Sequence, residues 1–386
     1  MDLNACLREL ERQGGSDLHL KVGRPPLFRI RGDLLPTEAP PLSDADIKNM
    51  LYSIMSPRLI KQFEETSELD FSYEVTDIGR FRVNMFVQRG HIGCVMRLIP
   101  LEVPTVEALD LPPVLNKIAD NENGLVLVTG PTGSGKSTTL AALIEHINQN
   151  YPVHIITVED PIEFVYTDKI ATINQRELGI DTGDLMSALR GMLREDPDII
   201  LMGEMRDVDT VRFGITAAET GHLVFATLHT NSAPQTIERI LDTMPPDARD
   251  LVREQLAMTL RGIICQRLCK RADGIGRIAA VEVLVGTETV RQLMLENKIK
   301  SIIKVMQDGS YFGMQTFNQA LYSLVQRGLI TQEEALSKSD TPEDLKLMFR
   351  GVMRGSSAQE IAPDISPAGR PKSGEPQKKK DRGFEF

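Results

Sequence analysis

The chain of 386 residues contains no tryptophan, only 5% aromatic residues and four cysteines. The cysteines are scattered along the chain, so they predict no disulfide framework. Two of them, Cys265 and Cys269, have the spacing C-x3-C rather than the C-x2-C of most zinc modules, and we expect no metal there. No run approaches the roughly 18 apolar residues of a membrane-spanning helix. No apolar signal-peptide core follows the N-terminus, so we expect a reducing, cytoplasmic location.

The chain also lacks an excess of positive charge. Lys and Arg number 44 against 54 Asp and Glu, which gives a net charge of −10. An acidic chain without a segregated basic face is a poor candidate for binding nucleic acid independently of sequence. With 41% hydrophobic and 25% charged residues, the composition is that of a soluble globular protein, and the length predicts two to three domains.

The pattern of the sequence changes three times along the chain. Residues 1–100 mix helix and strand and predict an α+β domain. Residues 101–120 are punctuated by proline without strong periodicity and predict a linker. In residues 121–354, short apolar runs alternate with helical segments, which is typical of a parallel sheet, and the region beyond about 285 is mainly helical. Residues 355–386 are rich in Pro, Gly, Ser and Lys and predict a disordered tail.

One strand of the first region is predicted with its two faces. Residues 80–87 alternate, and the apolar face consists of Phe81, Val83, Met85 and Val87. Arg82 therefore points to the other face, as do its neighbours Arg80 and Asn84. A second strand, 93–99, follows a hairpin turn predicted at Gly90-His91, and Arg97 lies on one face of it with Val95 and Ile99.

A phosphate-binding loop is the strongest motif in the chain. The pattern G-x-x-x-x-G-K-[ST] is satisfied between an apolar strand and a helical segment by Gly130, Pro131, Thr132, Gly133, Ser134, Gly135, Lys136 and Ser137, with Thr138 following. Glycines let successive backbone N–H groups surround phosphate oxygens, and a helix N-terminus adds positive partial charge. Lys136 is predicted to contact the β- and γ-phosphates, and the Ser137 hydroxyl to bind Mg²⁺. The motif thus predicts ATP and Mg²⁺ as ligands.

Two acidic clusters follow predicted strands at 154–158 and 198–202. Because ligands of open parallel sheets bind at the carboxyl ends of strands, both clusters are candidates for work on the nucleotide. We predict that Glu204 positions or activates the attacking water, the alternative being a solvated residue at a strand end. Glu163 is predicted to support Mg²⁺, directly or through water, the alternatives being loop capping or a surface ion pair. Glu159 and Asp160 compete for the same work, and the sequence does not rank them.

Two histidines flank the predicted strand 223–227. His222 and His229 are seven residues apart across an extended segment of roughly 20 Å, which argues against a shared metal. Each is either a hydrogen-bond donor near the γ-phosphate or a structural histidine.

Taken together, these segments carry a family likeness. Residues 130–138, 157–163, 196–207 and 216–230 resemble, in order, the Walker A, Asp box, Walker B and His box of the secretion ATPases of type IV pili and type II secretion. The closer resemblance is to the pilus retraction branch, and it includes residues 14–20, 79–82, 88–90 and 313–317. The likeness covers about residues 1–350.

The resemblance implies a homohexameric ATPase motor of pilus retraction and twitching motility at the cytoplasmic face of the inner membrane. Each subunit is expected to join a PAS-like N-terminal domain to a RecA-like P-loop domain with a helical C-terminal part. Arg82 and Arg97 match family arginines that reach the phosphates, and the likeness favours catalytic roles for His222 and His229. An inner-membrane platform protein and a paralogous retraction ATPase are the implied partners, and nucleic acid is not.

Two features depart from the retraction pattern. Residues 289–294 match a C-terminal family motif only loosely, and the extension from Gly355 exceeds what the fold needs. Its basic run, 378–380, is either a contact for acidic lipid or a partner, or part of a solubilising tail. An accessory retraction ATPase, a pilus extension or type II secretion ATPase, and a nucleotide-binding regulatory subunit are the related alternatives. A RecA-like nucleic-acid translocase is the alternative from another class.

Overall fold

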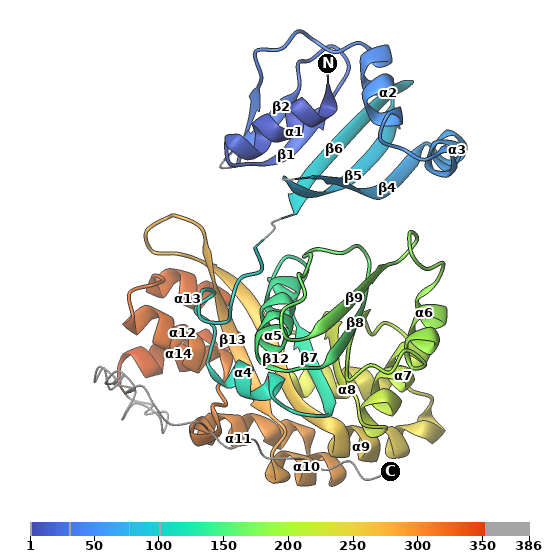
Figure 1. Ribbon diagram of the computed structural model, residues 1–386. Coiled ribbons are helices and arrows are strands. Elements are labelled where there is room, and N and C mark those ends of the chain that lie inside the picture. The colour runs from blue at the N-terminus through green and yellow to red at the C-terminus, as the bar shows by residue number, and fades with distance from the viewer. Residues whose placement is uncertain (1, 31, 77, 100–101, 352–386) are drawn as a thin grey trace, which may run out of the picture.

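Two β-sheets organise the chain, one formed before residue 100 and one after residue 120 (Figure 1). The computed structural model describes residues 2–30, 32–76, 78–99 and 102–351. The predicted tail, 355–386, with its basic run 378–380, lies outside the described residues. The mixed α/β class predicted from the pattern of the sequence is confirmed.

The N-terminal sheet has six strands in the order β3-β2-β1-β6-β5-β4, and all neighbouring strands are antiparallel. The helices and strands before residue 100 are α1 (Leu3–Arg12), β1 (Gly15–Leu20), β2 (Leu27–Ile30), β3 (Asp33–Pro36), α2 (Asp44–Tyr52), α3 (Pro57–Thr66), β4 (Glu68–Val75), β5 (Gly79–Gln88) and β6 (His91–Ile99). Side chains of α1 and α2, including Leu7 and Ile47, are fully buried in one apolar cluster with Phe81 and Met85 of β5. One face of the sheet is therefore covered.

The β5–β6 hairpin differs slightly from its prediction. The turn consists of Arg89 and Gly90, one residue earlier than expected, and Gln88 pairs with His91 across it. Both turn residues have positive φ, 51° and 79°, as a two-residue type I′ turn requires. Val87 is 42% exposed rather than buried with the rest of its predicted face, because it lies at the open end of the strand.

The second sheet has seven strands in the order β13-β12-β7-β11-β10-β8-β9. They are β7 (Gly124–Thr129), β8 (His154–Glu159), β9 (Thr172–Glu177), β10 (Ile199–Glu204), β11 (Leu223–Leu228), β12 (Leu260–Lys270) and β13 (Arg277–Val285). All neighbouring strands are parallel except β12 and β13, which form an antiparallel hairpin. The sequence predicted β7, β8, β10 and β11. β9 was missed because an edge strand of polar residues (TINQRE) carries no apolar run.

Helices cover both faces of this sheet. On one face, α4 (Val114–Ala119) and α5 (Lys136–Asn150) pack against Val126 and Val128. On the other face, Leu125 and Leu127 share a cluster with α6 (Leu185–Met192), α7 (Val208–Glu219), α8 (Ala233–Thr243) and α9 (Arg249–Thr259). Every residue of β7 is consequently buried, as in parallel sheets covered on both faces.

The segment predicted as a linker contributes to this core. Val106, Leu111 and Leu115 are buried against the face of the sheet that α5 covers. Although prolines interrupt its periodicity, the segment directs apolar side chains inward, both before α4 and within it.

Short helices complete the chain after β13. They are α10 (Glu288–Leu295), α11 (Ile302–Asp308), α12 (Phe317–Gln326), α13 (Gln332–Lys338) and α14 (Pro342–Phe349), with 3-10 turns at Ile299–Ser301 and Ser310–Phe312. Another 3-10 turn, Pro246–Ala248, lies between α8 and α9. α12 begins at a capping box in which Thr316 and Gln319 cap each other's backbone N–H groups. Within the described residues, no helix has the length and apolar content to cross a membrane.

Candidate nucleotide site

The loop between β7 and α5 is shaped by glycines that no other residue could replace without strain. Gly130 has a φ of 142°, and a Cβ added to it would lie 2.5 Å from the Gln266 carbonyl oxygen and 2.6 Å from the Ser134 hydroxyl. Gly135 caps α5 in the left-handed region, with a φ of 91°. The first N–H groups of α5 thus face the loop, where an anion is favoured.

Lys136 lies inside this loop. Its Nζ donates to the carbonyl oxygens of Gly130 at 2.8 Å and Pro131 at 3.2 Å. Desolvation lowers the pKa of Lys136, while the charges of Glu204 and Glu163 act to raise it. The ammonium therefore lies within the electrostatic reach of both predicted carboxylates.

A cleft of about 660 Å³ opens over the loop at the carboxyl ends of the central strands. Predicted residues that line it are Thr132, Gly133, Gly135, Lys136, Ser137, Thr138, Glu159, Asp160, Glu163, Glu204 and His229. The fold thus brings the loop, both acidic clusters and one histidine to one cavity, as the strand-end argument requires.

Glu204 ends β10 and is held from two sides. Its Oε2 lies 3.0 Å from His229 Nε2 and 2.8 Å from Arg206 Nε, and its side chain is 21% exposed. His229 follows β11, the neighbouring parallel strand, which explains why residues 25 positions apart meet. The carboxylate is fixed in direction and still open to the cleft.

Glu159 and Glu163 differ in their contacts and exposure. The Glu159 carboxylate is turned inward, where it accepts hydrogen bonds from Thr157 at 2.7 Å and Gln175 at 3.1 Å and from the backbone N–H of Glu163. Burial raises the pKa of Glu159. Glu159 therefore holds the loop, and Glu163, whose side chain is exposed, is the carboxylate available to a ligand.

Glu163 lies in the connection between β8 and β9, and Glu177, at the end of β9, joins this connection to the N-terminal sheet. Its carboxylate accepts hydrogen bonds from Arg80 at 2.5 Å and from Ser72 at 2.8 Å, both in the N-terminal sheet. It also accepts one from the backbone N–H of Ile162, the neighbour of Glu163, at 3.3 Å. Glu177 is only 3% exposed, and no motif indicated it because Arg80 and Ser72 are about 100 positions away.

His222 lies apart from the cleft. It precedes β11, at the amino end of the strand whose carboxyl end leads to His229. Its Nδ1 is 2.9 Å from the Ala217 carbonyl oxygen, and its own carbonyl accepts from the Gly124 N–H. Within one chain, His222 closes the turn after α7 and does not meet the other predicted site residues.

Arg82 and Arg97 also lie outside the cleft, on the N-terminal sheet. They are cross-strand partners in β5 and β6, with side chains 47% and 69% exposed. Arg97 Nε donates to buried Asp17 at 2.7 Å, and Arg82 Nε is 3.9 Å from Asp70. Burial acts to raise the pKa of Asp17, but hydrogen bonds from Ser16 and Arg97 leave it below its usual value. Two guanidinium groups directly opposite each other repel and favour an anion between them.

Other residues that line the cleft include Arg206, within the motif at 196–207, and four that lie in no motif: Phe164, Tyr166, Leu268 and Arg277. Arg206 could have been found from its place two residues after Glu204. Leu268 and Arg277 come from the β12–β13 hairpin, which the sequence did not predict.

The residues present fit a nucleoside triphosphate with Mg²⁺. The loop accepts no Cβ at Gly130, and the buried Ser134 hydroxyl has no protein partner among the described residues. A hydroxyl and a carboxylate, those of Ser137 and Glu163, supply the hard oxygen ligands that Mg²⁺ prefers. Lys136 also lines the cleft, and its ammonium supplies the positive charge that a triphosphate needs.

The loosely matching segment 289–294 is part of α10, outside the cleft. Val290 and Met294 are fully buried, whereas Arg291 pairs with Glu288 on the helix surface. The apolar positions of this segment thus serve the core.

The chain is similar to a protein-family model, to curated proteins and to solved structures. The family model described as type II/IV secretion system protein matches residues 3–337. The chain is 48% identical to the type IV pilus retraction ATPase PilT of Pseudomonas aeruginosa over 344 residues, which is 89% of this chain and all of that protein. It is 40% identical to the type IV pilus ATPase PilU of the same organism, over 91% of this chain and 92% of that one. A crystal structure of the pilus retraction motor PilT with bound ADP superposes with a TM-score of 0.85 at 45% identity, covering 90% and 99% of the two chains.

Proposed function

The chain belongs to the type II/IV secretion system protein family, and from this premise we propose that its nucleotide cleft drives the retraction of type IV pili. It is an ATPase with a RecA-like catalytic domain, similar over nearly its whole length to a retraction ATPase. The observation that carries the proposal is the meeting of Lys136, Glu163 and Glu204 in one cleft above a glycine-shaped loop.

The residues of the cleft divide the work of hydrolysis. The N–H groups of residues 133–138 and the Lys136 ammonium bind the β- and γ-phosphates and neutralise their charge. Ser137 and Glu163 would hold Mg²⁺, which when bound neutralises charge between the β- and γ-phosphates. Glu204 orients the attacking water and accepts its proton, and His229 and Arg206 keep the Glu204 carboxylate aimed at the cleft.

The site is completed by a second copy of the chain. Arg82 and Arg97 are exposed, lie side by side and do not reach the cleft of their own chain. On a neighbouring subunit's γ-phosphate their charge would stabilise the transition state. A ring of six subunits, as the family resemblance implies, provides such neighbours. We also assign His222 to this contact between subunits, since it lies away from its own cleft.

The chain is proposed to divide into an N-terminal domain, 1–100, and an ATPase domain, 121–354, with the segment between them packed on the second. Rotation of the first domain on the second converts hydrolysis into movement. An inner-membrane platform protein is the expected partner of the ring at the cytoplasmic face of the membrane, and a paralogous retraction ATPase is the expected second partner.

Imaging of single fluorescent pili tests this function. In a strain that lacks the gene, wild-type protein should restore pilus shortening, whereas Glu204→Gln should not. Loss of lengthening instead of shortening would favour the extension ATPase. Normal shortening without the gene, with a loss only under load, would favour an accessory motor. ATPase turnover stimulated by DNA would favour the translocase.

A further inference from the structure

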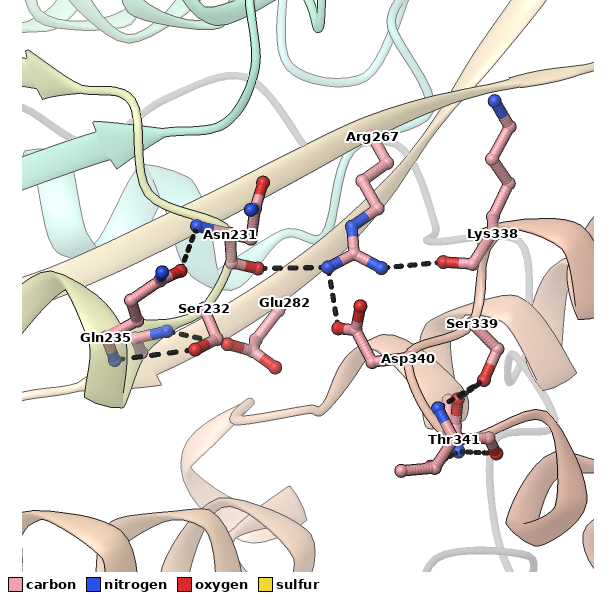
Figure 2. Close-up of polar contacts among 11 residues, drawn as sticks. Asn231, Ser232, Gln235, Arg267, Glu282, Lys338, Ser339, Asp340 and Thr341 are labelled. Atoms are coloured by element: carbon pink, nitrogen blue, oxygen red, sulfur yellow. Dashed lines mark hydrogen bonds and ion pairs between the residues drawn. The ribbon is translucent and has the colours of Figure 1, made fainter.

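The loop that carries His229 is also attached to α8 on one side and to β12 on the other. It connects β11 to α8 through Thr230, Asn231 and Ser232. Ser232 caps α8, and the Asn231 N–H donates to the Gln235 side chain at 2.8 Å. These local bonds fix the end of the loop on α8. The backbone carbonyl oxygen of Asn231 points away from α8 (Figure 2).

Arg267 of β12 binds that carbonyl. Its Nη2 donates to the Asn231 oxygen at 3.2 Å and to Asp340 Oδ2 at 2.6 Å, and its Nη1 donates to the Lys338 oxygen at 2.6 Å (Figure 2). The guanidinium carbon lies 4.1 Å from the centre of the Phe317 ring, and the side chain is 13% exposed. One buried cation thus joins the His229 loop to the junction of α13 and α14 and to the start of α12.

Glu282 of β13 makes a parallel connection beneath it. Its Oε1 accepts from the N–H of Ala233, the first residue of α8, at 2.8 Å, and the carboxylate also accepts from the N–H of Phe317, the first residue of α12. The side chain is 2% exposed, and burial raises its pKa to about 7, opposed by those two N–H groups and by Arg267. α8 and α12 therefore begin on one carboxylate, so their N-termini have a fixed separation.

We propose that Arg267 is a positioning residue for hydrolysis, which holds the backbone of the His229 loop so that His229 can orient Glu204. This role rests on the proposed function. The same guanidinium ties the loop to residues 338–340, so the C-terminal helices α12–α14 and the catalytic carboxylate cannot shift independently.

The chemistry of the site requires arginine. A planar fork can donate to two carbonyls and a carboxylate in fixed directions and also stack on an aromatic ring. A lysine retains the charge, but its single ammonium cannot hold both backbone segments at once. The conservative change Arg267→Lys therefore isolates geometry from charge.

Steady-state kinetics of full-length Arg267→Lys test the proposal. We expect kcat for ATP to fall about 10-fold while KM stays within about twofold, because the phosphate-binding loop is untouched. Binding of a non-hydrolysable ATP analogue should likewise stay within about twofold. Asp340→Asn, which leaves both carbonyl contacts of Arg267 in place, is a milder variant and should lower kcat by about threefold.

Arg261→Lys is the matched control. Arg261 lies on the same strand, and its guanidinium donates to the Asn123 carbonyl and side chain at 2.9 and 2.7 Å, far from the His229 loop. A comparable loss of Tm is expected in both lysine variants, with kcat reduced only in Arg267→Lys. Unchanged kcat in Arg267→Lys, or equal losses in both, would overturn the positioning role while wild-type turnover keeps the proposed function. A wild-type protein without ATP turnover would overturn both.

Discussion

The two sheets of this molecule place their functional groups in different ways. In β7 every residue is buried, so a parallel strand offers chemistry only where it ends, and Lys136, Glu204 and His229 all follow strand ends. In β5 and β6 one face is open, and Arg82 and Arg97 stand in the middle of their strands on that face. The parallel strands therefore build a cleft from their own chain, whereas we propose that the open face of the antiparallel sheet serves the cleft of another subunit.

The side chains of the two sheets also differ in how firmly the chain itself holds them. Glu204 is held by two neighbours that follow strands of its own sheet, His229 and Arg206. Arg97 has one buried anchor, Asp17, and Arg82 has only a distant acid at 3.9 Å. The Glu204 carboxylate is thus held in place by its own chain, whereas the arginine pair is exposed and lies outside the cleft of its own chain.

The largest expected effect is at the parallel sheet. Lys136→Ala should abolish nucleotide binding and hydrolysis, since it removes the cation inside the phosphate loop. Isothermal titration with an ATP analogue and a phosphate-release assay measure the two losses. Lys117→Ala, an exposed lysine of α4, is the control and should behave like wild type. Wild-type turnover in Lys136→Ala would refute the phosphate assignment.

Glu204→Gln is expected to separate binding from chemistry. The amide keeps the shape of the carboxylate but cannot accept a proton, so turnover should fall by about 100-fold or more with ATP binding intact. The same two assays measure it, with Glu219→Gln of α7 as the control. If turnover stays normal, the water-activating role passes to Glu163.

A smaller loss is expected from the antiparallel sheet. Arg82→Ala should lower ATP turnover by at least about 10-fold, because one of two charges on the γ-phosphate is lost. Circular dichroism should show an unchanged fold, since the side chain is 47% exposed. Arg24→Ala, an exposed arginine of the same region, should leave turnover unchanged. Equal turnover in both variants would assign Arg82 to a solvated face.

The smallest expected effect is at the contact between the sheets. Glu177→Gln leaves the buried Arg80 without a charged partner and should lower Tm by about 3–8 °C in calorimetry. Glu74→Gln is the matched control: Glu74 faces Arg80 across β4 and β5 but is exposed, and its Tm should stay within about 1 °C of wild type. Similar Tm values for the two variants would mean that Glu177 does not join the sheets.

Much of the cleft was predictable because its residues follow strands with short, apolar patterns. The sequence correctly placed β7, β8, β10 and β11 and the loop at 130–138, which suffices to bring both acidic clusters to one edge. The sequence predicted Glu163 as a support for Mg²⁺ but did not rank Glu159 and Asp160, because only folding shows which carboxylate turns inward. Arg267 and Glu177 escaped notice for a related reason: their partners are remote in sequence, and neither belongs to a motif.

Mixed assemblies of two inactive variants test most directly the claim that each ATP is split by groups from two subunits. Arg82→Ala retains an intact phosphate loop, and Lys136→Ala retains an intact arginine pair. When both are assembled together at equal amounts, about a quarter of the sites combine a working loop with a working arginine pair, and ATP turnover should rise accordingly. A mixture no more active than the average of its two components would show that each chain uses its own arginines, and it would contradict a site shared between subunits.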